Sequence, residues 1–323
     1  MYPLSHKTKH FFFVLIKWSI VVGAFYFIYQ KLTNNKALQF SVFIDFLSER
    51  NIFSLKNTII LILLSAFNWF LEIIKWQQLV SYIDKITLTK ATEQSLGALT
   101  ASLLTPNRIG EHGAKAMYFT PKHRKRIVLI NLLSHVLQMC CTVLLGSIGL
   151  VFFTNQYHLN TNYLNIISVL LIISILLMLI VTKSRFILKN KFITKLKVFI
   201  IKYPKNKIFL GFTLSLIRYF VFSFQFYFLL LIFKIDISYL NTMMVITTIY
   251  LLASIIPSIF IFDVIIKGSI AVYLCSYIPI NEITILSIIT IMWLLNFVLP
   301  SIFGSYYILN FNFPKTNKTD DII

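Results

Sequence analysis

The hydrophobic pattern of the chain contains six mostly apolar runs, each long enough to cross a bilayer as a helix. These runs cover residues 11–29, 58–80, 127–153, 163–182, 208–233 and 283–310. Two further apolar stretches, 92–119 and 240–275, are interrupted by Pro106 and Pro257. A proline removes a helical hydrogen bond, and broken backbone at membrane depth is tolerated only where protein or water covers it. The pattern predicts about six spanning helices and two re-entrant hairpins; two short spans over 240–275 are the alternative for the second hairpin.

The order of these elements repeats along the chain. Residues 11–153 contain a long helix, a span, the hairpin 92–119 and a second span, and residues 163–310 contain the same order around the hairpin 240–275. In this topology the two hairpins enter from opposite sides of the membrane. The sequence therefore predicts an all-α polytopic membrane protein, a single integral domain over 1–323, with two inverted-topology halves. Inverted halves with broken helices at matching places are typical of a transport site near the bilayer midplane.

Composition supports the membrane assignment and gives the chain an orientation. Hydrophobic residues make up 58% of the chain and charged residues 13%, which excludes an ordinary soluble domain. The net charge is +19, and its distribution follows the positive-inside rule: 19 Lys and Arg lie in the segments predicted on one side, against five on the other. The 19 lie in segments 1–10, 81–90, 120–126, 183–207 and 311–323. We therefore expect both termini in the cytoplasm and contacts with anionic phospholipid headgroups rather than nucleic acid.

The most basic of these segments, 183–207, has nine Lys or Arg and no acidic residue, interleaved with apolar side chains. This composition predicts an amphipathic cytoplasmic loop that lies on the inner leaflet and binds anionic lipid. The last segment, 311–323, is predicted to be a cytoplasmic tail.

Ionisable residues inside the apolar stretches are the main functional signal, because each costs at least about 2.5–3.5 kcal/mol at a helix centre unless it is paired or hydrated. In the first hairpin, Thr105 can cap a half-helix that starts at Pro106 and directs free N–H groups into the membrane. Such an N-terminus, together with nearby polar and basic side chains, suits a phosphate or carboxylate. The first-hairpin candidates for substrate binding are Thr105, Asn107, Arg108, Gly110, Glu111 and Lys115.

In the second hairpin an acid and a lysine with the same spacing, Asp263 and Lys267, follow the proline and complete a candidate cavity between the halves. Mutual neutralisation within each acid–lysine pair is the structural alternative. Arg218 is a further candidate, and Glu72, Asp263 or a lipid phosphate can each be its partner. Lys75 lies near a predicted helix end and is expected to extend its amine to the interface.

Recognised motifs for metal, cofactor or nucleotide chemistry are missing from the sequence. His112 follows Glu111, but no second histidine stands at the spacing of a zinc motif, and no nucleotide-binding glycine motif is present. We therefore expect no metal, no cofactor and no catalytic residue, and a transporter is favoured over an enzyme.

Three segments carry a resemblance to a known family: Leu103 to Glu111, Pro257 to Lys267 and Trp293 to Pro300. Over about 10–310 the chain resembles the transmembrane, flippase-type region of bacterial lysylphosphatidylglycerol synthases. The resemblance implies a multi-pass bacterial inner-membrane protein that translocates lipids through a cavity lined by the matching hairpin residues. A bifunctional synthase carries a soluble aminoacyl-transferase domain after this region, whereas the chain ends at Ile323, so lipid aminoacylation by this chain alone is not expected.

The resulting hypothesis is a flippase-like translocase that moves a phospholipid or lipid-linked headgroup between leaflets. One alternative is a membrane-embedded transferase with Glu111 or Asp263 as general base. Another is a non-catalytic scaffold that uses the basic 183–207 surface. A homo-oligomer and a separate soluble partner both remain open.

Overall fold

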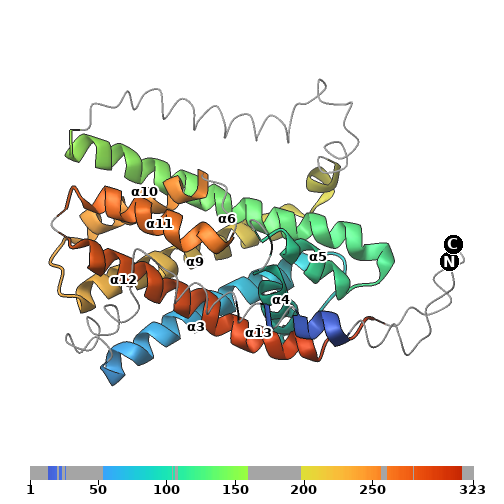
Figure 1. Ribbon diagram of the computed structural model, residues 1–323. Helices are drawn as coiled ribbons and strands as arrows, with labels where there is room; N and C mark the ends of the chain where they lie inside the picture. Colours follow the sequence, from blue (N-terminus) through green and yellow to red (C-terminus); the bar gives the residue numbers. More distant parts are fainter. Residues whose placement is uncertain are drawn as a thin grey trace, which may run out of the picture.

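The computed structural model describes residues 14–19, 22–23, 26, 54–103, 105, 108–158, 198–255, 260–278 and 280–314, with only the backbone described for 260–266. Within these ranges every element is a helix (Figure 1). The earlier helices are α3 (Leu55–Val80), α4 (Leu88–Ser102), α5 (Gly110–Met117) and α6 (Pro121–Gln156). The later helices are α9 (Lys205–Ile232), α10 (Tyr239–Ile255), α11 (Phe260–Cys275), α12 (Glu282–Trp293), the π-helix η1 (Leu294–Val298) and α13 (Leu299–Leu309).

Four of these helices are long and apolar enough to cross a membrane: α3, α6, α9, and the continuous helix formed by α12, η1 and α13. They coincide with the predicted runs 58–80, 127–153, 208–233 and 283–310, so a polytopic helical membrane protein fits the structure. The predicted run 163–182 lies outside the described residues, as does most of 11–29. Most of the loop 183–207 and of the tail 311–323 is also outside them.

Polar side chains start three of the helices. Ser54, Thr87 and Asn281 each accept a hydrogen bond from a backbone N–H in the first turn of α3, α4 and α12. Such caps satisfy N–H groups that have no partner within the helix.

Buried polar and exposed apolar residues are arranged as expected for a protein in lipid. On α3 the buried face carries Asn68, Glu72 and Lys75, whereas Leu63 and Phe67 are exposed. Since water is absent from the hydrocarbon layer, polar groups there must find partners inside the protein. The polar face of α3 therefore marks the interior of the bundle.

Both stretches expected to form hairpins consist of two short helices, α4 with α5 and α10 with α11. Helix α4 ends at Ser102 and α5 begins at Gly110, whereas α10 ends at Ile255 and α11 begins at Phe260; both prolines lie outside the described residues. The start of the second half-helix was predicted wrongly for the first hairpin, because α5 begins at Gly110 and not at Pro106.

Helices from the first part of the chain pack against helices from the second part. Helix α3 contacts α9, α4 contacts α13, and α6 contacts α10. Lys207 reaches the carbonyl of Gln78 and Gln225 reaches that of Leu61, so α3 and α9 are antiparallel. The first helix of each hairpin thus packs against the last long helix of the other part.

Glycines permit close contact in two of these three pairs, α4 with α13 and α6 with α10. A Cβ on Gly304 of α13 would lie 2.2 Å from the Leu96 carbonyl oxygen and 2.2 Å from Thr100 Oγ1 on α4. A Cβ on Gly149 of α6 would lie 1.9 Å from Thr247 Oγ1 on α10. Small residues let membrane helices approach backbone to backbone, which is the main source of attraction between them in lipid.

Aromatic contacts join the connecting segments at each end of the bundle. At one end Tyr82 packs on Tyr203 with ring centroids 4.9 Å apart, and Tyr118 packs on Phe311 at 4.7 Å. Burial raises the pKa of Tyr203, which keeps its hydroxyl protonated as a donor to the Leu79 carbonyl. This first end therefore gathers the segments after α3 and α5, before α9 and after α13.

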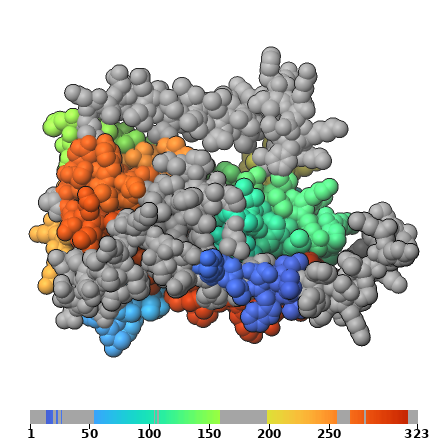
Figure 2. All heavy atoms as spheres, viewed as in Figure 1, coloured from blue at the N-terminus to red at the C-terminus, as the bar shows by residue number. Residues whose placement is uncertain are grey.

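The opposite end joins the segments after α6 and α11, where Tyr157 and Tyr277 lie 5.8 Å apart. Figure 2 shows α11 in orange at this end and the start of α6 in blue-green at the other. Near the N-terminus, Lys17 donates a hydrogen bond to the Leu309 carbonyl at 3.0 Å, and Figure 2 shows this blue segment beside the red C-terminal helix.

Candidate functional site

The break between α4 and α5 is a tight turn built by Thr105, Arg108 and Gly110. The Thr105 hydroxyl donates to the Ser102 carbonyl at 2.8 Å and accepts from the Gly110 N–H at 2.9 Å. Arg108 has a φ of 56°, in the left-handed region that non-glycine residues rarely occupy. A Cβ on Gly110 would lie 2.7 Å from Thr105 Cγ2, so this turn requires glycine.

This geometry uses three N–H groups at the start of α5, where the sequence led us to expect free ones. The N–H groups of Gly110, Glu111 and His112 are bonded to Thr105, Arg108 and Ile109. Arg108 has a left-handed backbone conformation that an α-helix cannot include, so α5 begins only after it, at Gly110. The N–H groups of Gly110, Glu111 and His112 are therefore already used within the turn, and side chains such as Arg108 are the described groups that could bind an anion there.

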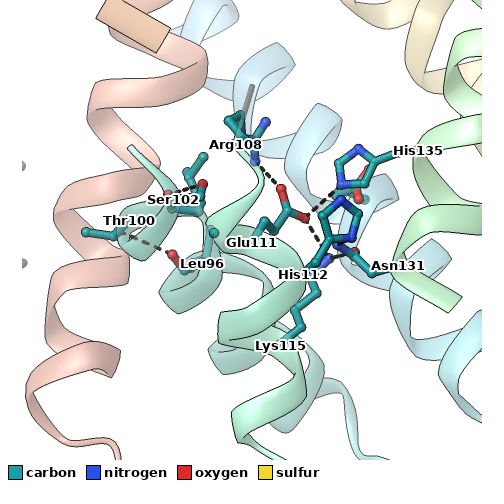
Figure 3. A network of polar contacts seen from close by, with 12 residues as sticks. Leu96, Thr100, Ser102, Arg108, Glu111, His112, Lys115, Asn131 and His135 are labelled. Carbon is teal, nitrogen blue, oxygen red and sulfur yellow. Dashed lines mark hydrogen bonds and ion pairs between the residues drawn. The ribbon is translucent and has the colours of Figure 1, made fainter. Parts of the chain in front are cut away.

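Glu111 is the centre of the first buried charge network (Figure 3). It is 3% exposed. Its carboxylate contacts Arg108 Nη2 at 2.7 Å and Lys115 Nζ at 2.9 Å, and His135 Nε2 lies 3.5 Å away. The Arg108 side chain is 23% exposed and its buried Nε makes no hydrogen bond. The network thus combines a buried carboxylate with a guanidinium that retains donor capacity and access from outside.

Lys115 connects this network to α3 and α6. Its amine donates to Asn131 Oδ1 at 2.9 Å and lies 4.2 Å from the centre of the Trp76 ring. Asn131 also contacts His112 Nδ1 at 3.0 Å, and the His112 and His135 rings lie 5.1 Å apart (Figure 3). Trp76 in turn donates a hydrogen bond to Gln94 on α4 at 2.8 Å. The Lys115 ammonium, carried by α5, is therefore held in place by groups from α3, α4 and α6.

A second buried network joins α3 to α9. The Glu72 carboxylate contacts Lys75 Nζ at 2.7 Å and Arg218 Nη1 at 2.5 Å. Arg218 also donates to Asn68 Oδ1 at 3.1 Å. Of the three partners left open by the sequence, Glu72 is the one found. The expectation that Lys75 extends to the interface is wrong: it is 2% exposed, because its carboxylate partner is inside the bundle.

Asn296 in the π-helix η1 links the second network to the last long helix. Its amide donates to Gln225 Oε1 at 2.8 Å, while its Oδ1 accepts from Asn68 at 2.9 Å. The irregular backbone here also offers carbonyls to α3: that of Asn296 accepts from Trp69, and that of Leu295 from Ser65. A π-helix inside an α-helix frequently marks a functional site.

Phe297, the next residue of η1, brings the two hairpins together. Arg108 Cζ lies 5.8 Å from its ring centroid and Lys267 Nζ lies 5.7 Å from it. Both distances are within the range of a cation–π contact. A cation from each hairpin therefore meets on one aromatic ring of the last long helix.

The predicted site residues fall into three groups. Thr105, Arg108, Gly110, Glu111 and Lys115 lie together at the tip and second helix of the first hairpin. Lys267 joins them through Phe297, and Arg218 belongs to the second network. Asn107 and the side chain of Asp263 lie outside the described residues.

Sequence reasoning missed three important residues, Asn131, His135 and Phe297. The first two are polar residues four apart within the apolar run 127–153, a spacing that places them on one helix face toward α5. The spacing of Asn131 and His135 could therefore have been recognised in the sequence. Nothing in the sequence distinguishes Phe297 as a residue that two cations contact, because it is one of 31 phenylalanines.

Comparisons with models of protein families, with curated proteins and with solved structures find no match to this chain.

The chemistry available at the Glu111 network is ion binding. Two cations contact the carboxylate, which stabilises its charged form and leaves it a poor proton acceptor. In the described part of the chain no group of three His, Cys, Asp or Glu is placed to hold a metal ion. The partly exposed Arg108, by contrast, can bind an oxyanion with the N–H groups that Glu111 does not use.

Proposed function

We propose that the protein is a flippase-like translocase that moves a phospholipid or lipid-linked headgroup between the leaflets of a membrane. The observation that carries the proposal is the meeting of Arg108 and Lys267, one from each hairpin, on Phe297. Cations inside a bundle are costly in lipid, and they commonly mark the path of a charged substrate. The resemblance to the flippase-type region of lysylphosphatidylglycerol synthases supports the same function.

The packing of helices from one part of the chain against helices from the other supports two inverted halves within this proposal. Helices α3 and α9, which occupy corresponding places in the two halves, are antiparallel. The contact of α4 with α13 likewise corresponds to the contact of α10 with α6. Re-entrant hairpins from opposite leaflets would then meet near the midplane, where one site can be opened to either side.

Arg108 would bind the phosphate, with Lys115 and Lys267 adding positive potential. Glu111 would balance Arg108 and Lys115 when no substrate is present, since uncompensated buried charge is strongly unfavourable. This assignment disfavours Glu111 as the general base of a transferase, because a general base needs a carboxylate that is available to accept a proton.

Leaflet exchange of fluorescent phospholipids in proteoliposomes tests the proposal. We expect Arg108→Asn to slow exchange at least tenfold relative to wild type. Asparagine tolerates the left-handed backbone at this position, so the change removes the guanidinium without straining the turn. Glu111→Gln should also slow exchange, because it leaves Arg108 and Lys115 uncompensated.

Lys234 provides a matched control. It too is a basic residue with a positive φ, 58°, but it lies in the segment after α9 and not in a hairpin. Lys234→Asn should therefore exchange lipid at the wild-type rate. Exchange no faster than in protein-free liposomes, or equal rates in Arg108→Asn and wild type, would refute the proposal. A lipid product detected by mass spectrometry would instead favour the transferase.

A further inference from the structure

A cavity of about 30 Å³ lies between α9, α10, α11, α12 and η1, and Phe297 of η1 lies between it and Arg108 of the Glu111 network. Its aromatic walls include Phe222, Phe226 and Phe297, and Lys267 also lines it. A single water requires only about 10–15 Å³ on this measure, so the space accommodates more than one oxygen atom.

Two other lining residues, Tyr250 and Trp293, have buried polar atoms without a hydrogen-bond partner: the phenol oxygen of Tyr250 and the indole Nε1 of Trp293. Trp293 is 5% exposed, so its N–H has no access to bulk solvent. Native proteins pair almost all such groups, and an unpaired one suggests an absent ligand, ion or water.

The polar groups around the cavity share one chemical character. The Trp293 indole and the Lys267 ammonium can only donate hydrogen bonds, and the Tyr250 phenol readily donates one. Among the described lining residues there is no acid and no side-chain amide. Donors of this kind, with a positive charge beside them, match the oxygens of an anion better than they match a cation or a neutral donor.

We propose that this cavity is an oxyanion site, in which Trp293, Tyr250 and Lys267 hold phosphoryl oxygens of a phosphate ester. Phospholipid headgroups and free phosphate share this chemistry. The cavity adjoins the turn at Arg108, because Phe297 lines it and also contacts Arg108, and Lys267 belongs to both places. The proposal deepens the proposed function by naming the donors that hold the phosphate, but binding at the cavity can be measured without any lipid being transported.

Isothermal titration calorimetry on the purified full-length protein in neutral detergent tests the site with three probes. These are inorganic phosphate, dihexanoyl phosphatidylglycerol and, as the phosphate-free comparison, dihexanoylglycerol. We expect at least one phosphate-bearing probe to bind and dihexanoylglycerol not to bind. Binding of inorganic phosphate would identify the phosphate group itself as sufficient, whereas binding of phosphatidylglycerol alone would identify a lipid headgroup as the source.

Tyr250→Phe and Trp293→Phe should each weaken that binding at least tenfold. Neither change breaks a hydrogen bond of the described structure. The ligand-free Tyr250→Phe variant should therefore fold and unfold like wild type, whereas Trp293→Phe also removes buried ring volume and should be less stable than wild type. Tyr219→Phe is the matched control, because the Tyr219 hydroxyl is also buried and unpaired but its residue does not line the cavity. Equal affinity in Tyr250→Phe, Trp293→Phe and wild type would overturn the site, as would failure of both phosphate-bearing probes to bind.

Discussion

At the scale of single residues, Glu72 carries the sharpest stability prediction. Its carboxylate is shared by Lys75 and Arg218. Breaking a buried ion pair costs about 3–5 kcal/mol, because the remaining charge has no partner. We expect Glu72→Gln to lower the free energy of unfolding by about that amount, measured by denaturant titration in micelles. Adding Lys75→Met should restore part of the loss; a double variant no more stable than Glu72→Gln would contradict this account.

At the scale of helices, the contact of α13 with α4 depends on Gly304. An alanine there would place Cβ 2.2 Å from the Leu96 carbonyl, so the two helices would have to separate. Overpacking of this kind costs about 1–3 kcal/mol, and we expect Gly304→Ala to lower the melting temperature of the purified protein accordingly. Gly113 is the control, because no atom lies within 4 Å of a Cβ built on it. Gly113→Ala should leave stability unchanged or raise it by up to about 1 kcal/mol.

At the scale of helices, some features could be predicted from the sequence and others could not. Run length predicted the four long apolar helices, and the two prolines predicted that each interrupted stretch is divided into two short helices, because these features depend on local hydrophobicity and on backbone chemistry. The start of α5 at Gly110 depends on the left-handed backbone of Arg108, which no residue preference indicates. The partner of Arg218 and the place of Phe297 depend on packing between helices distant in sequence.

At the scale of the whole molecule, the two ends of the bundle differ in charge. The end that holds the start of α6 carries Lys122, Arg124, Lys125 and Arg126 in one helical turn and a half. The segment between α9 and α10, at the other end, carries only Lys234 and Asp236. Basic residues are retained on the cytoplasmic side during insertion. The charge difference therefore predicts that the first end faces the cytoplasm.

Cysteine labelling tests this orientation. In a background where Cys140, Cys141 and Cys275 are replaced by alanine, we expect Asp236→Cys to react with a membrane-impermeant maleimide in intact cells. Lys122→Cys should react only after the membrane is permeabilised, because it lies at the basic end. Both positions are exposed, so unequal labelling reports the side of the membrane and not burial within the protein. Labelling of Lys122→Cys in intact cells, with Asp236→Cys protected, would show the opposite orientation and contradict the prediction.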